Sequence, residues 1–294
     1  MSILRDNVNG GAAELRRLIK KSVVTVPGVF NGISALLAQD AGFMALYLSG
    51  SGVAGKAGLP DLGITTLTEI AEEARKIVAV SRLPLIVDID TGFGETLNVI
   101  RAVRTLESAG VAAVHIEDQE IPKKCGHLSG KRIVAEEEMV RKLRAAASAK
   151  RSDDFIIIAR TDARAVEGLD ASIERAKGYI EAGADAIFPE AMESRAEFAF
   201  FAKKVKTLLV ANMTEFGKSP LLNAAELGKM GYKIVLFPLT GFRASLLSMK
   251  EAYSQLCREG TQKHMMDKLM TREEFYNIIS YKEYEDEDND FHDA

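Results

Sequence analysis

The sequence predicts a closed (β/α)8 barrel of the TIM type, on the strength of three observations. Eight apolar runs of strand length alternate with eight segments of helical pattern, and such units fill about 250 residues in a typical barrel. Several of the runs are continuously apolar, as expected for parallel strands that are buried on both faces. No Gly-rich dinucleotide-binding motif follows the first strand, which disfavours the alternative of an open doubly wound sheet.

The expected strands are spaced evenly along the chain. They cover residues 23–26, 44–48, 85–90, 112–117, 155–161, 186–189, 208–212 and 234–237. A short helix over 12–21 precedes them, and the barrel helices are expected at 33–41, 67–81, 95–109, 136–149, 171–182, 195–204, 224–230 and 244–258. Glycines at positions 42, 110, 183, 231 and 260 close several of these helices, where a positive φ is needed.

The C-terminal part of the chain departs from this repeat. One or two further short helices are expected after residue 260, so that residues 1–280 form one domain with an N-terminal helix and a C-terminal helical extension. Residues 281–294 are acidic and poor in aliphatic side chains, and we expect this tail to be solvated and disordered.

Composition excludes several classes of protein. The net charge is -4 and the pI is near 5.8, so there is no basic surface for nucleic acid. No apolar run has the length of a membrane span, and the N-terminus lacks a signal segment. Two cysteines in 294 residues do not form a disulfide framework. These features predict a soluble, reduced, cytoplasmic protein.

Two acids end the third strand, at the edge where the active sites of such barrels lie. Asp88 and Asp90 are two residues apart and therefore point to the same side. Two ionised carboxylates that are shielded from water require a nearby cation, and hard oxygen ligands favour Mg²⁺ or Mn²⁺. The alternative is a pair of exposed acids that cap the next helix. Asp61 is a further candidate ligand.

Other polar residues follow the later strands. Glu117 ends the fourth strand at the same mouth, whereas His115 lies deeper and is expected to be a hydrogen-bonded core histidine. Arg160 ends the fifth strand, and its planar guanidinium suits a carboxylate-bearing ligand. The alternative is a structural ion pair of Arg160 with Glu117 or Glu190. A loop of small residues after the second strand, from Ser49 to residue 55, gives a weaker signal for an anion site.

Cys125 lies in the loop after the fourth strand, beside Lys123, Lys124 and His127. Nearby positive charge lowers the pKa of a thiol from its reference of about 8.5, so Cys125 is a candidate general acid, base or nucleophile. The alternative is an ordinary exposed thiol. A zinc site is disfavoured because no second Cys/His pair stands at ligand spacing.

With these residues assembled, the chain resembles the isocitrate lyase / phosphoenolpyruvate mutase superfamily and, within it, the 2-methylisocitrate lyase family. The resemblance covers roughly residues 10–280. Its most specific motif is K-K-C-G-H at 123–127, since mutases and decarboxylases of the superfamily generally lack this cysteine. The other matching motifs are YLSG at 47–50, GLPDLGI at 58–64, DIDTGFG at 88–94, IEDQ at 116–119, ARTDA at 159–163 and FPLTGFRA at 237–244.

This resemblance implies cleavage of 2-methylisocitrate to pyruvate and succinate with Mg²⁺, or alternatively Mn²⁺, as cofactor. Isocitrate and 2,3-dimethylmalate are the alternative substrates. The implied metal ligands are Asp61, Asp88 and Asp90. The implied substrate-binding residues are Ser49, Gly50, Ser51, Lys123, Gly126, Arg160, Glu190, Asn212, Thr214 and Arg243, with Glu190 as a supporting acid, although family members often have Gly at the position of Ser51. The implied pocket for the C2 methyl group consists of Phe188, Leu236 and Pro238.

The resemblance also assigns catalytic roles. Cys125 would protonate the succinate carbanion, and Tyr47 would be the base for the C2 hydroxyl or the group that positions it. The implied catalytic set is completed by Glu117, Arg160 and His127.

Residues 123–131, called the lid loop here, contain Gly126, Ser129 and Gly130 as flexible points. We therefore expect a gating loop that closes over substrate and is mobile without it. The family resemblance further implies a homotetramer in which a helix near residues 244–258 is exchanged between paired subunits.

Overall fold

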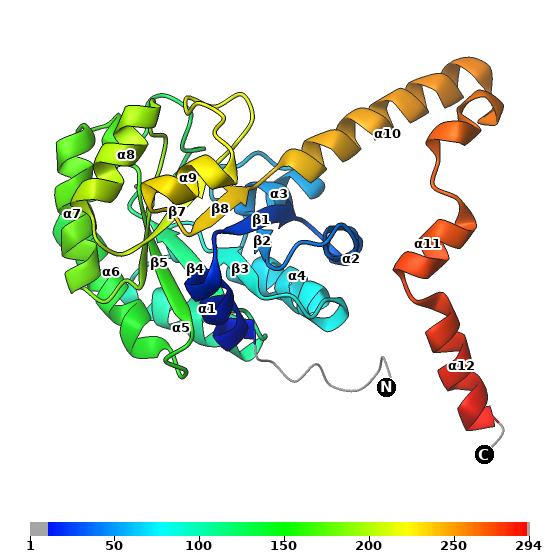
Figure 1. Ribbon diagram of the computed structural model, residues 1–294, viewed down its shortest axis with the longest axis horizontal. Coiled ribbons are helices and arrows are strands. Elements are labelled where there is room, and N and C mark those ends of the chain that lie inside the picture. The colour runs from blue at the N-terminus through cyan, green and yellow to red at the C-terminus, as the bar shows by residue number, and fades with distance from the viewer. Residues whose placement is uncertain (1–10, 293–294) are drawn as a thin grey trace.

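The computed structural model describes residues 11–292, in which eight parallel strands close into a barrel in the order β1 to β8 (Figure 1). The predicted TIM-type fold is thereby confirmed. The strands are β1 (Val24–Val29), β2 (Leu46–Leu48), β3 (Leu85–Asp88), β4 (Ala113–Glu117), β5 (Ile156–Thr161), β6 (Ala186–Pro189), β7 (Leu208–Asn212) and β8 (Ile234–Phe237). All eight lie where the apolar runs predict them, because each run must be buried on both faces of the sheet.

Helices alternate with the strands along the chain as expected, and most of them surround the barrel. They are α1 (Gly11–Lys21), α2 (Gly32–Asp40), α3 (Gly50–Lys56), α4 (Leu67–Val80), α5 (Thr96–Ser108), α6 (Glu136–Ala149), α7 (Leu169–Glu181), α8 (Arg195–Lys204), α9 (Ala224–Met230) and α10 (Thr240–Glu259). The C-terminal extension holds α11 (Arg272–Ile278) and α12 (Tyr281–His292), and the short 3-10 helices are η1 (Ala163–Ala165) and η2 (Lys263–Lys268). The five glycines expected to end helices all have positive φ.

Two segments differ from the sequence prediction. The small-residue stretch after β2 is the short helix α3, not a loop, because Val53 and Ala54 pack into the core and the amide of Val53 donates to the carbonyl of Ser49 at 3.0 Å. The acidic tail, which was expected to be disordered, forms helix α12 as far as His292. An ion pair between Lys282 and Asp286, at 3.2 Å and one turn apart, supports that helix. The last two residues of the tail lie outside the described range.

Residues alternate along each strand between two buried layers. One set packs between the sheet and the surrounding helices and includes Val87, Ile116 and Ala159. The other set fills the barrel interior and includes Ile86 and Ile158, with α1 closing the lower end. At the upper ends of the strands, the inward-pointing positions are polar. The fold therefore gathers these polar side chains inside the mouth of the barrel.

Helix α10 leaves the barrel and extends away from it, and α11 and α12 follow it, with α11 returning beside α2 (Figure 1). No residue of α10 is buried. Its apolar side chains are therefore exposed, including Tyr253 at 66% and Leu247 at 59%. None of the helices within residues 11–292 is long and apolar enough to cross a membrane.

Candidate active site

A cavity opens at the carboxyl ends of the barrel strands and is closed above by the lid loop. Its lining comes from seven of the eight strand ends and the loops that follow them, so most of the predicted site residues are brought together. The lining residues are Tyr47, Ser49, Ser51, Asp61, Asp88, Lys123, Cys125, Gly126, His127, Arg160, Phe188, Glu190, Asn212, Thr214, Pro238 and Leu239.

Tyr47 and His115 form a buried pair at the floor of this cavity. The Tyr47 hydroxyl lies 2.7 Å from Nε2 of His115, and the two rings are stacked. Nε2 of His115 is also 3.4 Å from the Asp88 carboxylate. Burial lowers the pKa of His115 to about 4, so the imidazole is neutral at pH 7. The expected core histidine is confirmed, and it contacts the site directly.

The carboxylates of Asp88 and Asp90 lie close together as predicted, but the two residues do not belong to one continuous strand. Strand β3 ends at Asp88, and Asp90 adopts a left-handed conformation with φ of 47°. Both carboxylates face Gly50, where an added Cβ would lie 3.1 Å from Asp88 Oδ2 and 3.3 Å from Asp90 Oδ1. Both side chains are buried, so the alternative of exposed helix-capping acids is wrong.

The pKa values of the two acids are shifted in opposite directions. Burial and the charge of Asp88 raise the pKa of Asp90 to about 6. Burial also opposes ionisation of Asp88, but the electrostatic effect of the His115 ring, which is charged only at low pH, and of Lys123 and Arg160 outweighs it and lowers the pKa to about 2. Asp88 is thus the permanently ionised member of the pair.

Lys123 places an ammonium group among the predicted metal ligands. Its Nζ lies 2.5 Å from Asp61 Oδ1 and 2.7 Å from Asp90 Oδ1, and its side chain is 4% exposed. Among residues 11–292, no three acidic, His or Cys side chains are already gathered around a metal-sized position. The carboxylates nevertheless accommodate a cation here, because they hold one from the lid loop.

Arg160 forms structural ion pairs and also lines the cavity. Its guanidinium is paired with Glu117 at 3.2 Å and with Asp162 at 3.0 Å, and it lies over the Phe188 ring at 5.3 Å. It also lines the cavity, and its side chain is 9% exposed. Within residues 11–292, the Glu117 carboxylate has this ion pair with Arg160 but no hydrogen bond of good geometry, and burial raises the pKa of this carboxyl. Arg160 is therefore oriented by acids while one edge faces the ligand space.

Glu190 links the lid loop to strand β7. Its carboxylate accepts from Asn212 Nδ2 at 3.3 Å and lies 3.1 Å from His127 Nε2. The Nδ1 atom of His127 accepts from the amide of Lys218 at 2.9 Å, so the ring proton is on Nε2 and points at Glu190. Burial disfavours the charged form of Glu190, yet Arg160 and His127 hold its pKa well below the usual range.

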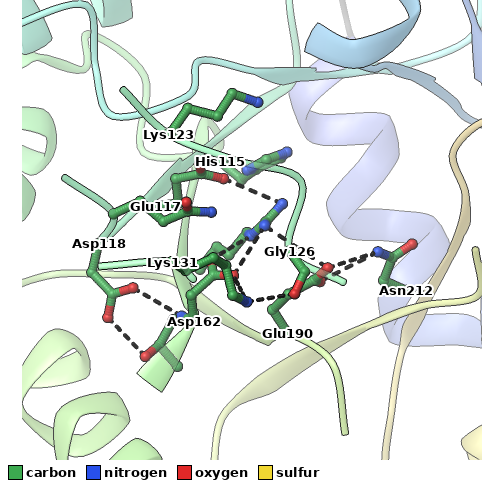
Figure 2. Close-up of polar contacts among 12 residues, drawn as sticks. His115, Glu117, Asp118, Lys123, Gly126, Lys131, Asp162, Glu190 and Asn212 are labelled. Atoms are coloured by element: carbon green, nitrogen blue, oxygen red, sulfur yellow. Dashed lines mark hydrogen bonds and ion pairs between the residues drawn. The ribbon is translucent and has the colours of Figure 1, made fainter. Parts of the chain in front are cut away.

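The lid loop is closed over the site in this structure. Its base is fixed by an antiparallel bridge between Gln119 and Ile133, and the Gln119 side chain bonds both the amide and the carbonyl of Lys124. At its tip, Gly126 packs directly on the barrel (Figure 2). An added Cβ there would lie 2.2 Å from Glu190 Oε1 and 2.5 Å from Arg160 Nη2.

Cys125 differs from expectation in its acidity. Burial raises the pKa of this thiol instead of lowering it, and the negative charge of Glu190 adds to the effect. The neighbouring cations do not compensate, since Lys123 is paired with Asp61 and Asp90 and His127 is directed at Glu190. The thiol is thus held protonated at neutral pH.

Five predicted residues do not line the cavity. Three of them, Gly50, Asp90 and Glu117, each contact a residue that does. The other two lie further away. Arg243 lies at the rim, where its side chain is 45% exposed, 3.5 Å from Glu215 and over the Phe216 ring. Leu236 is buried within the barrel interior, below the cavity. Leu239, from the loop after β8, lines the cavity without having been predicted.

Sequence reasoning also missed a buried polar network beneath the lid loop, formed by Asp118, Lys131, Thr161, Asp162 and Tyr179. Asp118 accepts at 2.8 Å from the Thr161 hydroxyl, from the Asp162 amide and from the Tyr179 hydroxyl. Lys131 pairs with Asp162 at 2.6 Å (Figure 2). The available signal was the strand-end position of Asp118 and Asp162.

Comparison with known proteins agrees with this geometry. Residues 15–257 match the model of the phosphoenolpyruvate phosphomutase family. The chain belongs to the phosphoenolpyruvate mutase/isocitrate lyase superfamily. It is 54% identical to a 2-methylisocitrate lyase of Aeropyrum pernix, over 93% of this chain and 89% of that protein. It is 49% identical to a 2-methylisocitrate lyase of Bacillus subtilis, over 93% of this chain and 91% of that one.

Solved structures of other superfamily members have the same fold. A 2,3-dimethylmalate lyase superposes with a TM-score of 0.90 at 36% identity, covering 95% of each chain. A phosphonopyruvate hydrolase, solved with oxalate and Mg²⁺, superposes with a TM-score of 0.85 at 28% identity, covering 97% of each chain. The superfamily thus includes enzymes that act on different small carboxylates.

Proposed function

We propose that the protein is a Mg²⁺-dependent carbon–carbon lyase that cleaves 2-methylisocitrate to pyruvate and succinate. The observation that carries this proposal is Cys125, whose protonated thiol is carried by the closed lid loop and lines the cavity. A thiol in that state is a general acid ready to protonate a carbanion. The similarity to 2-methylisocitrate lyases over 93% of the chain supports the choice of substrate.

The cavity has groups suited to each part of such a substrate. Arg160 would bind the carboxylate of the pyruvate half, together with Ser49 and Ser51 where α3 begins. His127, Asn212 and Thr214 would contact the succinate half. Phe188, Leu239 and Pro238 give the apolar wall for the C2 methyl group, with Leu236 supporting it from below.

Asp61, Asp88 and Asp90 are the residues that would hold the metal, with Mn²⁺ as an alternative to Mg²⁺. Carboxylate oxygens are the donors that these ions prefer. Asp61 and Asp90 already contact one positive charge, the ammonium of Lys123. When bound, the ion supplies Lewis-acid stabilisation of the negative charge that develops on the pyruvate oxygens.

Side chains of the protein would carry out the proton transfers. Tyr47 faces the cavity, and burial followed by the charge of Asp88 raises the pKa of its phenol. This supports a role in orienting the C2 hydroxyl instead of removing its proton. A carboxylate would have to accept the C2 hydroxyl proton, and Glu117 is the candidate within the implied catalytic set, since burial raises its pKa. Scission of the C2–C3 bond would then leave the electron pair on the succinate half, which would take its proton from the Cys125 thiol and leave a thiolate.

The test of this function is a direct assay of the purified protein with Mg²⁺ and three substrates. We expect pyruvate and succinate from 2-methylisocitrate, with kcat/KM well above that for isocitrate or 2,3-dimethylmalate. Faster release of glyoxylate from isocitrate, or a preference for dimethylmalate, would move the protein to a sister activity. Absence of pyruvate from 2-methylisocitrate would refute the proposal.

We further propose that α10 is exchanged between two copies of this chain within a homotetramer. Leu246, Met249, Tyr253 and Leu256 recur at helical spacing on one face of α10, and all are exposed at 38% or more. Exposed apolar faces of this extent mark protein interfaces. A second copy is the occupant favoured here, because α10 turns away from the barrel of its own chain (Figure 1).

The double variant Leu246→Glu/Tyr253→Glu should therefore dissociate the assembly. We expect light scattering to give a tetramer mass for the wild type and a lower mass for the variant. Ser248→Glu, on the same helix but off this face, is the matched control and should retain the wild-type mass. A wild type that is monomeric at micromolar concentration would contradict the proposal.

A further inference from the structure

The lid loop carries three cationic or imidazole side chains that reach the barrel, and one of them has no role in the mechanism above. Lys123 contacts the proposed metal ligands, and His127 contacts Glu190. The third is Lys131, at the C-terminal end of the loop. Its side chain is 1% exposed, although lysine is rarely buried to this extent without a specific partner.

Lys131 joins the loop to itself and to the barrel. Its Nζ lies 2.6 Å from Asp162 Oδ1, and it also donates to the carbonyl of Gly126, the residue after Cys125 (Figure 2). An ammonium group in this position would be strongly destabilised without these acceptors. The two contacts thus belong to the closed loop, whereas an open loop returns Lys131 to water.

Asp162 is shared between the loop and the ligand-binding arginine. The same carboxylate accepts from Nε of Arg160 at 3.0 Å and from Nη2 at 3.3 Å. Its own backbone amide donates to Asp118 at 2.8 Å, and Asp118 is fixed in turn by Tyr179 from α7. Asp162 is therefore a rigid acceptor that touches Lys131 on one side and Arg160 on the other.

We propose that Lys131 is a positioning residue that locks the closed lid loop, by joining the carbonyl beside Cys125 to the carboxylate that orients Arg160. The proton-donating thiol and the substrate-binding guanidinium then reach their working positions together. This inference rests on the proposed function for the catalytic part of its effect. The lock itself can be measured without any substrate.

The first measurement is the rate at which iodoacetamide alkylates Cys125 in the unliganded protein, followed by peptide mass spectrometry. We expect Lys131→Met to raise this rate roughly tenfold, because the loop opens more often. Loss of a nearby positive charge by itself raises the thiol pKa and slows alkylation. A faster reaction therefore cannot come from the lost charge and identifies opening of the loop as the cause.

The second measurement is steady-state turnover. A loop that no longer holds its closed position misplaces the thiol, so kcat should fall about 100-fold while the substrate dissociation constant changes much less. Lys131→Arg, which keeps the charge, should recover part of both effects. Lys124→Met is the matched control, since it removes a lysine of the same loop whose backbone, not its side chain, bonds to Gln119.

Unchanged alkylation of Cys125 in Lys131→Met would overturn the lock, whatever happens to kcat. Faster alkylation together with a wild-type kcat would overturn its link to catalysis. If Lys131→Met does not fold, Lys131→Gln serves for the same two measurements. Failure of the wild type to cleave 2-methylisocitrate would leave the alkylation result intact, so the two proposals fail separately.

Discussion

Replacement of Cys125 by serine should abolish turnover while substrate binding survives. A serine hydroxyl is a far weaker acid than a thiol, so it cannot deliver the proton that the succinate carbanion requires. Loss of a positioned general acid costs up to about 10⁴-fold in rate, and we expect kcat to fall by about 10³-fold or more. Calorimetric titration of the Mg²⁺-loaded variant with 2-methylisocitrate should give a dissociation constant close to that of the wild type.

Cys257 provides the control, because it is an exposed thiol on α10, away from the cavity. Cys257→Ser should retain wild-type kcat.

A second expectation concerns pH. Since burial raises the pKa of Cys125, the pH midpoint for alkylation of Cys125 should be higher in the folded protein than in the unfolded chain. Its acid form is present at lower pH and is lost as pH rises through that pKa. A Cys125→Ser variant that keeps most of its kcat would remove the thiol from the proton transfer.

The second large effect is expected from a single methyl group at Gly126. In Gly126→Ala the new Cβ would lie 2.2 Å from Glu190 Oε1 and 2.5 Å from Arg160 Nη2. Glu190 and Arg160 are themselves held by ion pairs, so the lid loop must move away from the barrel instead. Displacement of the neighbouring Cys125 should lower kcat about 100-fold or more, measured by pyruvate release.

Ser129→Ala, at an exposed position of the same loop, is the control for this substitution and should be nearly silent. The alkylation rate of Cys125 should rise in Gly126→Ala and stay unchanged in Ser129→Ala. Wild-type turnover of Gly126→Ala would mean that the closed loop seen here is not the catalytic arrangement.

The barrel was predictable from sequence because each strand and helix has a local signature. Continuous apolar runs such as 85–90 and glycines such as Gly110 mark the elements without reference to the rest of the chain. The site residues at strand ends followed from the same repeat. Helix α3 was missed because three glycines in seven residues hide its helical pattern. The tail helix was missed because its charged composition is also typical of disorder.

The acidity of Cys125 and the role of Lys131 could not be predicted in the same way. Lysines adjacent in sequence suggested a positive environment for the thiol, but the ammonium of Lys123 is paired with acids from distant loops, such as Asp61. Likewise, the partners of Lys131 are a strand-end acid 31 residues away and a carbonyl of its own loop. Pairings of this kind depend on the tertiary structure, and sequence spacing carries no information about them.

The ammonium of Lys123 lies between Asp61 and Asp90, at the position proposed for the metal ion. If these carboxylates hold the metal, binding of the metal ion requires the Lys123 ammonium to leave Asp61 and Asp90. The measured affinity for the metal then includes the work of detaching a residue of the lid loop, so it reports on the loop as well as on the ligands. The metal-free protein, in turn, is spared the repulsion of a bare acidic cluster and can fold before any ion is present.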